Sequence, residues 1–102
     1  MYKLLGILKR PQGMDFDEFK TWWLETHAPK VKKWPGLVEY RINLCTTDDQ
    51  PFDGVAEVWF SSKQAMDDVF STPEGQTARG SATGGSSDLA ILLTEEHIMV
   101  EP

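Results

Sequence analysis

The sequence predicts an α+β fold in which two helices cover one face of a four-stranded antiparallel sheet. Three observations support this prediction. The length of 102 residues fits one domain, spanning residues 1–102. With 40% hydrophobic and 25% charged residues, the composition is that of a globular protein that can bury its own core. Finally, strand-like and helix-like segments follow one another in the order β-α-β-β-α-β.

The first strand and the first helix have the clearest signals. Residues 2–9 carry apolar side chains on both faces, which is typical of a strand that is buried on both sides. Asp15 is a favourable N-cap for the helix that follows. His27 lies four positions after Trp23, at the C-terminal end of the apolar face of this helix. Pro29 predicts that the helix ends there, because the residue before a proline disfavours helical angles. The apolar face consists of Phe16, Phe19 and Trp23.

The remaining elements complete a ferredoxin-like topology. A turn at Trp34-Pro35-Gly36 precedes the second strand, and Ser61 or Ser62 caps a second helix that ends or is interrupted at Thr72-Pro73. Both β-α-β crossovers place their helix on the same face, as in the split β-α-β arrangement. Strands are predicted at residues 37–45, 54–60 and 89–94, the last with an extension over 95–100.

The alternation along these strands indicates a second, uncovered face of the sheet. We expect Val55, Glu57 and Trp59 to share that face. A small protein seldom leaves such a face to water, so we expect a homodimer in which two sheets meet and enclose a lumen, forming a dimeric α+β barrel. The opposite faces consist of Val38, Tyr40, Ile42 and Leu44 in one strand and Ala56, Val58 and Phe60 in the next.

Residues 79–88 (RGSATGGSSD) are predicted to form an exposed, mobile loop. They include three glycines and four serines or threonines, which have little helix propensity. Ordering each residue costs roughly 1–2 kcal/mol, and no apolar side chain larger than Ala82 is present to offset that cost. If this segment gates the lumen, shortening it should alter substrate access.

Charge and composition exclude several classes of function. Residues 1–51 carry eight basic and seven acidic groups, whereas residues 52–102 carry two and nine, so there is no basic stripe for nucleic acid or an anionic membrane. No apolar run is long enough to span a membrane. Two histidines and one cysteine lack metal-ligand spacing, so we expect no metal, and no glycine motif that would cradle a phosphate is present. Cys45 is the single cysteine, which fits a cytoplasmic location.

His27 and Glu57 are the candidate catalytic residues. Imidazole titrates near neutral pH and is the usual proton carrier in enzymes. Glu57 lies in an otherwise apolar strand, where a carboxylate is costly unless it is paired or faces a wet cavity. Both residues also have structural interpretations: a histidine that caps a helix end or packs beside Trp23, and a glutamate on a solvated strand face. Indole and phenol rings line pockets for flat ligands but also fill cores, so Trp23, Tyr40 and Trp59 are candidate substrate-binding residues.

Two motifs resemble those of the EthD-like family of dimeric α+β barrels. One is Trp-x-x-x-His-x-Pro at residues 23–29, and the other is Asp-Gly-x-Ala-Glu at residues 53–57. The resemblance covers residues 2–77 and 89–100, while the Gly/Ser-rich residues 78–88 depart from the helix that family members have there. It implies a homodimer and matches the family's helix-end histidine to His27. In such a dimer Tyr40 can face either the lumen or the helices.

The resemblance also implies chemistry on small aromatic, polyketide-like or lactone substrates without metal or cofactor. We therefore expect a lyase or isomerase that catalyses dehydration, decarboxylation, cyclisation or isomerisation, in which His27 moves a proton and Glu57 orients it or carries a second proton. Two alternatives stay open. One is a cofactor-free monooxygenase of a phenolic substrate, and the other is a non-catalytic small-molecule binding protein of a catabolic operon.

Overall fold

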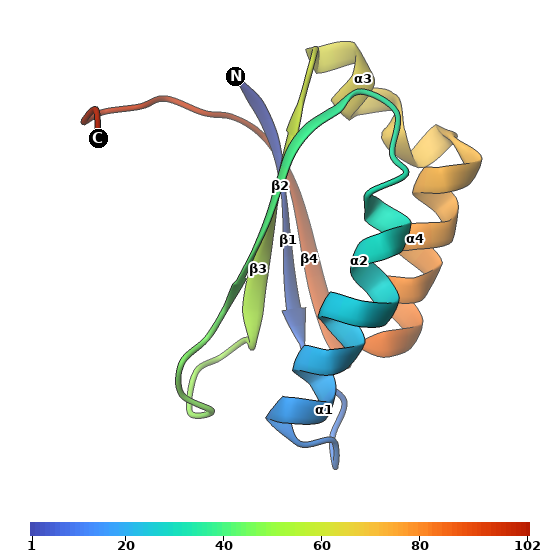
Figure 1. The fold of residues 1–102 in the computed structure, drawn as a ribbon, viewed down its shortest axis with the longest axis vertical. Coiled ribbons are helices and arrows are strands. Elements are labelled where there is room, and N and C mark those ends of the chain that lie inside the picture. The colour runs from blue at the N-terminus through green and yellow to red at the C-terminus, as the bar shows by residue number, and fades with distance from the viewer.

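A four-stranded antiparallel sheet with all of its helices on one side forms the molecule (Figure 1). The computed structural model describes all 102 residues. The sheet order is β2-β3-β1-β4, as in ferredoxin-like folds. The first strand of the chain is therefore central and pairs with the last strand, which lies at an edge of the sheet. This confirms the predicted fold class. The strands are β1 (Tyr2–Lys9), β2 (Leu37–Leu44), β3 (Gly54–Phe60) and β4 (Asp88–Glu95).

The first helical segment is continuous, but its middle turn is π-helical. It consists of α1 (Phe16–Thr21), the π-helical turn η1 (Trp22–His27) and α2 (Ala28–Val31). Asp15 caps it as predicted, because its Oδ1 accepts a hydrogen bond of 2.8 Å from the backbone N–H of Glu18. The prediction that the helix ends at Pro29 is wrong. Pro29 lies in the first turn after the π-helical turn, where the proline ring and its missing N–H are tolerated.

The second helical segment contains the largest departure from the sequence prediction. It comprises α3 (Lys63–Asp68), the 3-10 turn η2 (Val69–Ser71) and α4 (Pro73–Gly85). Ser62 and Thr72 cap α3 and α4 by accepting hydrogen bonds from backbone N–H groups three residues on. Residues 79–85 are therefore helical, and the prediction of an exposed loop over 79–88 is wrong for most of that range.

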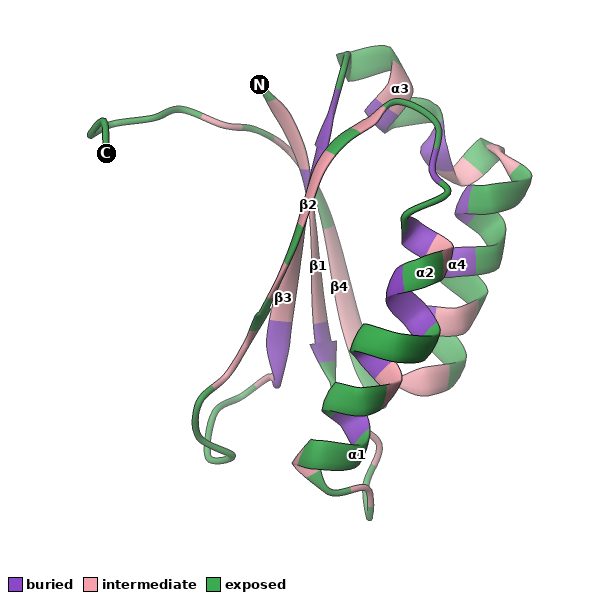
Figure 2. Cartoon of the chain, in the orientation of Figure 1, coloured by how far each residue is buried: buried purple, intermediate pink, exposed green.

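Close packing explains why this glycine-rich segment is helical. Ala78 and Ala82 are buried against the rest of the protein, and α4 lies beside the first helical segment (Figure 2). A Cβ atom added at Gly85 would lie 2.0 Å from the Trp22 ring, so this residue allows the helix backbone to approach the indole. The small side chains thus permit close helix–helix contact, and the burial that results offsets their poor propensity.

Two neighbouring glycines of α4 give opposite expectations for stability. A Cβ atom at Gly84 meets nothing within 4 Å, so Gly84→Ala should raise the free energy of unfolding by about 0.5–1 kcal/mol. Gly85→Ala should lower it by about 1–3 kcal/mol, because the methyl group displaces Trp22. Urea denaturation of both variants measures the difference. Two variants of equal stability would show that α4 does not pack against Trp22 in solution.

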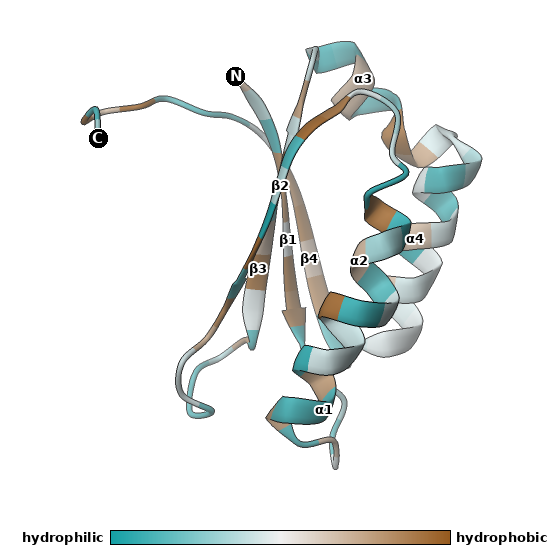
Figure 3. Cartoon of the chain, in the orientation of Figure 1, coloured by the Kyte–Doolittle hydropathy of each residue, from teal (hydrophilic) through white to brown (hydrophobic).

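The core lies between the sheet and the helices. Figure 3 shows hydrophobic positions along the strands, and the inward side chains form the buried clusters. Val38 is 58% exposed, unlike Tyr40 and Ile42. The pairing of β2 with β3 shifts register between Leu37 and Glu39, which turns Val38 outward. The prediction that Val38 shares a face with Tyr40 and Ile42 is therefore wrong. The largest fully buried side chains are Trp23, Phe19, Phe60, Val58 and Val69.

The C-terminal end leaves the sheet after Glu95. Residues 96–102 form no strand and extend away from the body of the protein (Figure 1), so the predicted extension over 95–100 is confined to its first residue. Ile98, Met99 and Val100 are exposed there. None of the helices has the length and apolar character needed to cross a membrane.

Candidate functional site

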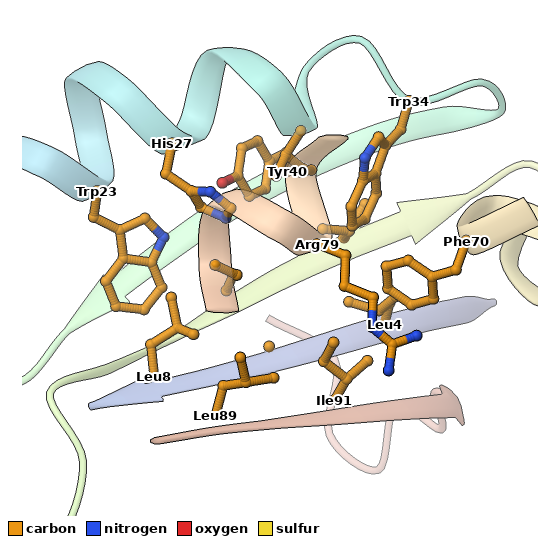
Figure 4. Close-up of a pocket in the computed structure, with 16 residues that line it drawn as sticks. Leu4, Leu8, Trp23, His27, Trp34, Tyr40, Phe70, Arg79, Leu89 and Ile91 are labelled. Atoms are coloured by element: carbon orange, nitrogen blue, oxygen red, sulfur yellow. The ribbon is translucent and has the colours of Figure 1, made fainter. Parts of the chain in front are cut away.

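An apolar cavity of about 40 Å³ lies between the inner face of the sheet and the helices (Figure 4). Thirteen of its 16 lining residues are hydrophobic, and they come from all four strands and from the helical segments. The cavity forms within one chain. It does not lie in the space that two paired sheets would enclose. Its walls include Leu4, Leu8, Val31, Trp34, Val58 and Ile91.

The His27 imidazole lies in the wall of this cavity and is held from two sides. Its ring stacks on Trp22 with centroids 5.1 Å apart and an angle of 15° between the planes. Hydrogen bonds between residues five apart in a π-helical turn bring these two side chains over each other. On the other side, Nδ1 lies 3.0 Å from Oγ of Ser81 in α4. His27 is 6% exposed, so both its position and its surroundings are fixed.

Burial keeps His27 neutral at physiological pH. Removal of the ring from water lowers the pKa of His27 to about 4, and the positive charge of Lys30 acts in the same direction. In the tautomer in which Nδ1–H donates to Ser81 Oγ, Nε2 carries the lone pair and is free to accept a proton. The Ser81 hydroxyl can also donate to an unprotonated Nδ1, so this contact holds the ring in position in either tautomer.

Two further polar atoms of the cavity have no hydrogen-bond partner. Nε1 of Trp23 and Oη of Tyr40 are the two buried side-chain polar atoms in the structure that are unpartnered. Both residues line the cavity together with His27 (Figure 4). Burial raises the pKa of Tyr40 to about 12, and the Trp23 indole N–H acts in the opposite direction because it lies near the phenol oxygen without reaching hydrogen-bond geometry. The phenol stays protonated and is a donor. Native proteins rarely leave buried donors unsatisfied, which marks this wall as a place for an acceptor atom.

The arrangement is suited to binding and polarising an oxygen atom. Two donors, Trp23 Nε1–H and Tyr40 Oη–H, and a neutral imidazole line one apolar space. In a site of low polarity, such donors stabilise negative charge on an oxygen much more strongly than they do in water. The predicted substrate-binding residues Trp23 and Tyr40 are thus brought together with His27, and Tyr40 faces the helices.

Glu57 and Trp59 lie elsewhere, on the opposite face of the sheet. Glu57 accepts hydrogen bonds from Lys3 at 3.0 Å and from Asn43 at 2.6 Å, and Trp59 Nε1 donates to Glu96 at 2.8 Å. Burial acts to raise the pKa of Glu57, but the bonds from Lys3 and Asn43 outweigh it and lower that pKa. These two residues do not line the cavity that contains His27. Alternate residues of β3 point to opposite faces of the sheet, and Ala56 and Val58 are the β3 residues that face the cavity.

Three residues of the site were absent from the predicted set: Arg79, which lines the cavity, and Trp22 and Ser81, which contact His27. Trp22 was hidden because a π-helical turn has no simple sequence signal. Ser81 and Arg79 fell in the segment that composition predicts to be a loop. The Thr72-Pro73 pair, an N-cap followed by a proline at the first helical position, was the available signal that a helix begins there.

The EthD domain model matches residues 11–83, which is most of the chain. The chain belongs to the EthD family. A protein of Rhodococcus erythropolis, described as an uncharacterised 11.0 kDa protein in the thcB-thcC intergenic region, is 27% identical over 98% of this chain and 99% of its own length. Among solved structures, an EthD family protein of Bacillus halodurans matches with a TM-score of 0.83 and 23% identity over 95% of this EthD chain and 99% of its own. A dimeric ferredoxin-like protein of Bacteroides fragilis matches with a TM-score of 0.69 and 12% identity over 93% and 95%.

Proposed function

We propose that this EthD protein is a cofactor-independent lyase or isomerase of a small aromatic, polyketide-like or lactone substrate. The observation that carries the proposal is that both unpartnered buried donors of the protein, Trp23 Nε1 and Tyr40 Oη, line the same apolar cavity as a neutral, positioned histidine. An apolar pocket with a few convergent polar groups is the usual form of a small-molecule site.

The reaction begins with proton transfer from carbon. Nε2 of His27 takes a proton from the carbon beside a carbonyl group, and the electron pair of the broken C–H bond moves onto the carbonyl oxygen. Tyr40 and Trp23 donate hydrogen bonds to the resulting enolate oxygen. The imidazolium then returns its proton to another carbon in an isomerisation, or to a departing hydroxyl group in a dehydration. The new negative charge favours the protonated His27 that burial otherwise disfavours.

Hydrogen–deuterium exchange tests the proposal even when the final product is unidentified. A panel of aryl ketones and lactones is incubated with the protein in D₂O, and NMR follows loss of the proton beside the carbonyl. We expect accelerated exchange in at least one compound that binds. Binding without exchange or conversion would contradict the proposal and leave a binding protein. Oxygen uptake coupled to product formation would favour the monooxygenase alternative; a putative antibiotic biosynthesis monooxygenase of Nitrosomonas europaea shares this fold.

We also propose that the protein is a homodimer that forms through the outer face of the sheet. All helices lie on the other side, so this face is left uncovered in the single chain (Figure 1). Apolar side chains of β1, β3 and β4 share it, and Leu92 is 49% exposed there. The Bacteroides fragilis protein and a protein of Jannaschia with the same fold are both described as dimeric.

A single free cysteine, Cys45, fits a cytoplasmic location, which cell fractionation would test.

A pair of substitutions in β4 tests this interface. Sedimentation should give twice the chain mass of 11.5 kDa at micromolar concentration. Leu92→Glu should give monomers, because it would bury an unpaired charge between the two sheets. Leu93→Glu is the matched control, since Leu93 is 46% exposed on the other face of the same strand. A wild-type monomer, or equal effects of the two substitutions, would contradict the interface.

A further inference from the structure

One end of the cavity carries a cation that no protein group neutralises. Arg79 lines the cavity from α4 and is the one permanently charged residue among the lining residues. Its guanidinium lies over the Phe70 ring, 5.1 Å from the centroid, and the residue is exposed, so it lies at the rim. In Figure 4 this group points away from the end of the cavity that holds Trp23. The cavity is therefore polar at two separate places.

Arg79 is not explained as part of a surface ion pair. None of the ion pairs of the structure includes it, and its guanidinium donates no side-chain hydrogen bond. Helical positions three and four residues away hold no carboxylate, since they are Gly75, Gln76, Ala82 and Thr83. Residues 52–102 carry nine acidic groups and two basic ones, so an arginine without a partner is unexpected in this half of the chain.

Contact with an aromatic ring holds a guanidinium in place for a planar anion. The Arg79 guanidinium lies over the Phe70 ring, and its N–H groups donate no hydrogen bond to a protein group. Those N–H groups match the two oxygens of a carboxylate, which arginine binds through two parallel hydrogen bonds. A point charge such as lysine lacks this geometry.

We propose that Arg79 selects ligands that carry a carboxylate, so that the substrate is a carbonyl compound with an acid group at its far end. The carboxylate binds Arg79 at the rim, and the apolar body enters the space between the sheet and α4, which at about 40 Å³ has to widen to admit an aromatic ring. The carbonyl group lies at the other end, next to Trp23 and Tyr40. The orientation of the carbonyl rests on the proposed function, whereas the selection of an acid does not.

A matched pair of probes tests the selection. 4-Acetylbenzoate carries a ketone and a carboxylate across one ring, and methyl 4-acetylbenzoate differs by loss of the charge. Calorimetric titration of the wild type should show about tenfold tighter binding of the acid than of the ester. Arg79→Gln should abolish this preference with unchanged affinity for the ester, and Arg79→Lys should restore it in part.

Two further variants separate the outcomes. Lys63→Gln removes a positive charge from the same half of the chain at an exposed position and should keep the acid preference. His27→Gln should also keep the preference for the acid. If the wild type prefers the acid but shows no deuterium exchange, the role of Arg79 is supported while the proposed function fails. Equal affinity of the wild type for acid and ester, a preference that survives Arg79→Gln, or no binding of either probe at millimolar concentration would overturn the inference.

Discussion

Replacement of His27 by glutamine should reduce the rate of deuterium exchange at the carbon of the substrate by about 10²–10⁴-fold, the usual contribution of a positioned general base. Glutamine has nearly the size of histidine and can keep a hydrogen bond to Ser81, so the fold and the affinity for substrate should change little. The loss should therefore appear in the rate constant at saturation and not in the binding constant.

His97 provides the matched control for this substitution. It is the other histidine of the chain, and it lies exposed near the C-terminus, where it pairs with Glu95. His97→Gln should leave the exchange rate unchanged. Equal rates of wild type and His27→Gln would remove the proton-transfer role of His27, whereas the two donors of the cavity would remain a binding site.

The free energy of unfolding should fall by up to about 3 kcal/mol as the pH is lowered from about 6.5 to about 4. In the folded protein the pKa of His27 is about 4, whereas an unfolded histidine titrates near 6.5. Between these values the unfolded state binds more protons than the folded state, so acid favours unfolding. Below pH 4 both states are protonated at this residue, and no further loss comes from it.

Urea denaturation of wild type and His27→Gln at several pH values measures this effect. The variant should lose the dependence between pH 6.5 and about 5.5, above the range in which Glu57 and Glu96 take up protons in the unfolded state, where their pKa values return to about 4.5. The difference between the two proteins removes the carboxylate contribution at lower pH. An unchanged slope in His27→Gln would show that the imidazole is not buried in solution.

Local rules explain which parts of the fold were predictable. Helix starts at Asp15 and Ser62, the turn at Gly36 and the alternation along β3 all depend on residues close together in sequence. The helix spacing also placed His27 and Trp23 on one face, and that face lines the cavity. These signals gave the topology and half of the candidate site.

The remaining features depend on contacts between distant segments. Residues 79–85 are helical because Ala78, Ala82 and Gly85 pack against other elements, which composition alone does not reveal. The separation of Glu57 from His27 follows from which face of β3 the helices cover. Both are titratable residues within apolar patterns of the sequence, and such a pattern does not reveal which face of the sheet each occupies. The pairing of Ser81 with His27 spans 54 positions in the chain and was equally hidden.

The indole N–H signal of Trp23 provides the most direct test of the central claim, that ligand oxygen binds inside the cavity under the helices. The protein has four tryptophans, and Trp34 and Trp59 already donate hydrogen bonds to Glu74 and Glu96, whereas Trp23 has no partner. In an NMR titration with a ketone that undergoes exchange, the proton signal of Trp23 Nε1–H should move downfield as it gains an acceptor, while that of Trp59 stays in place. Movement of the Trp59 signal with an unchanged Trp23 signal would place the ligand on the outer face of the sheet and contradict the account.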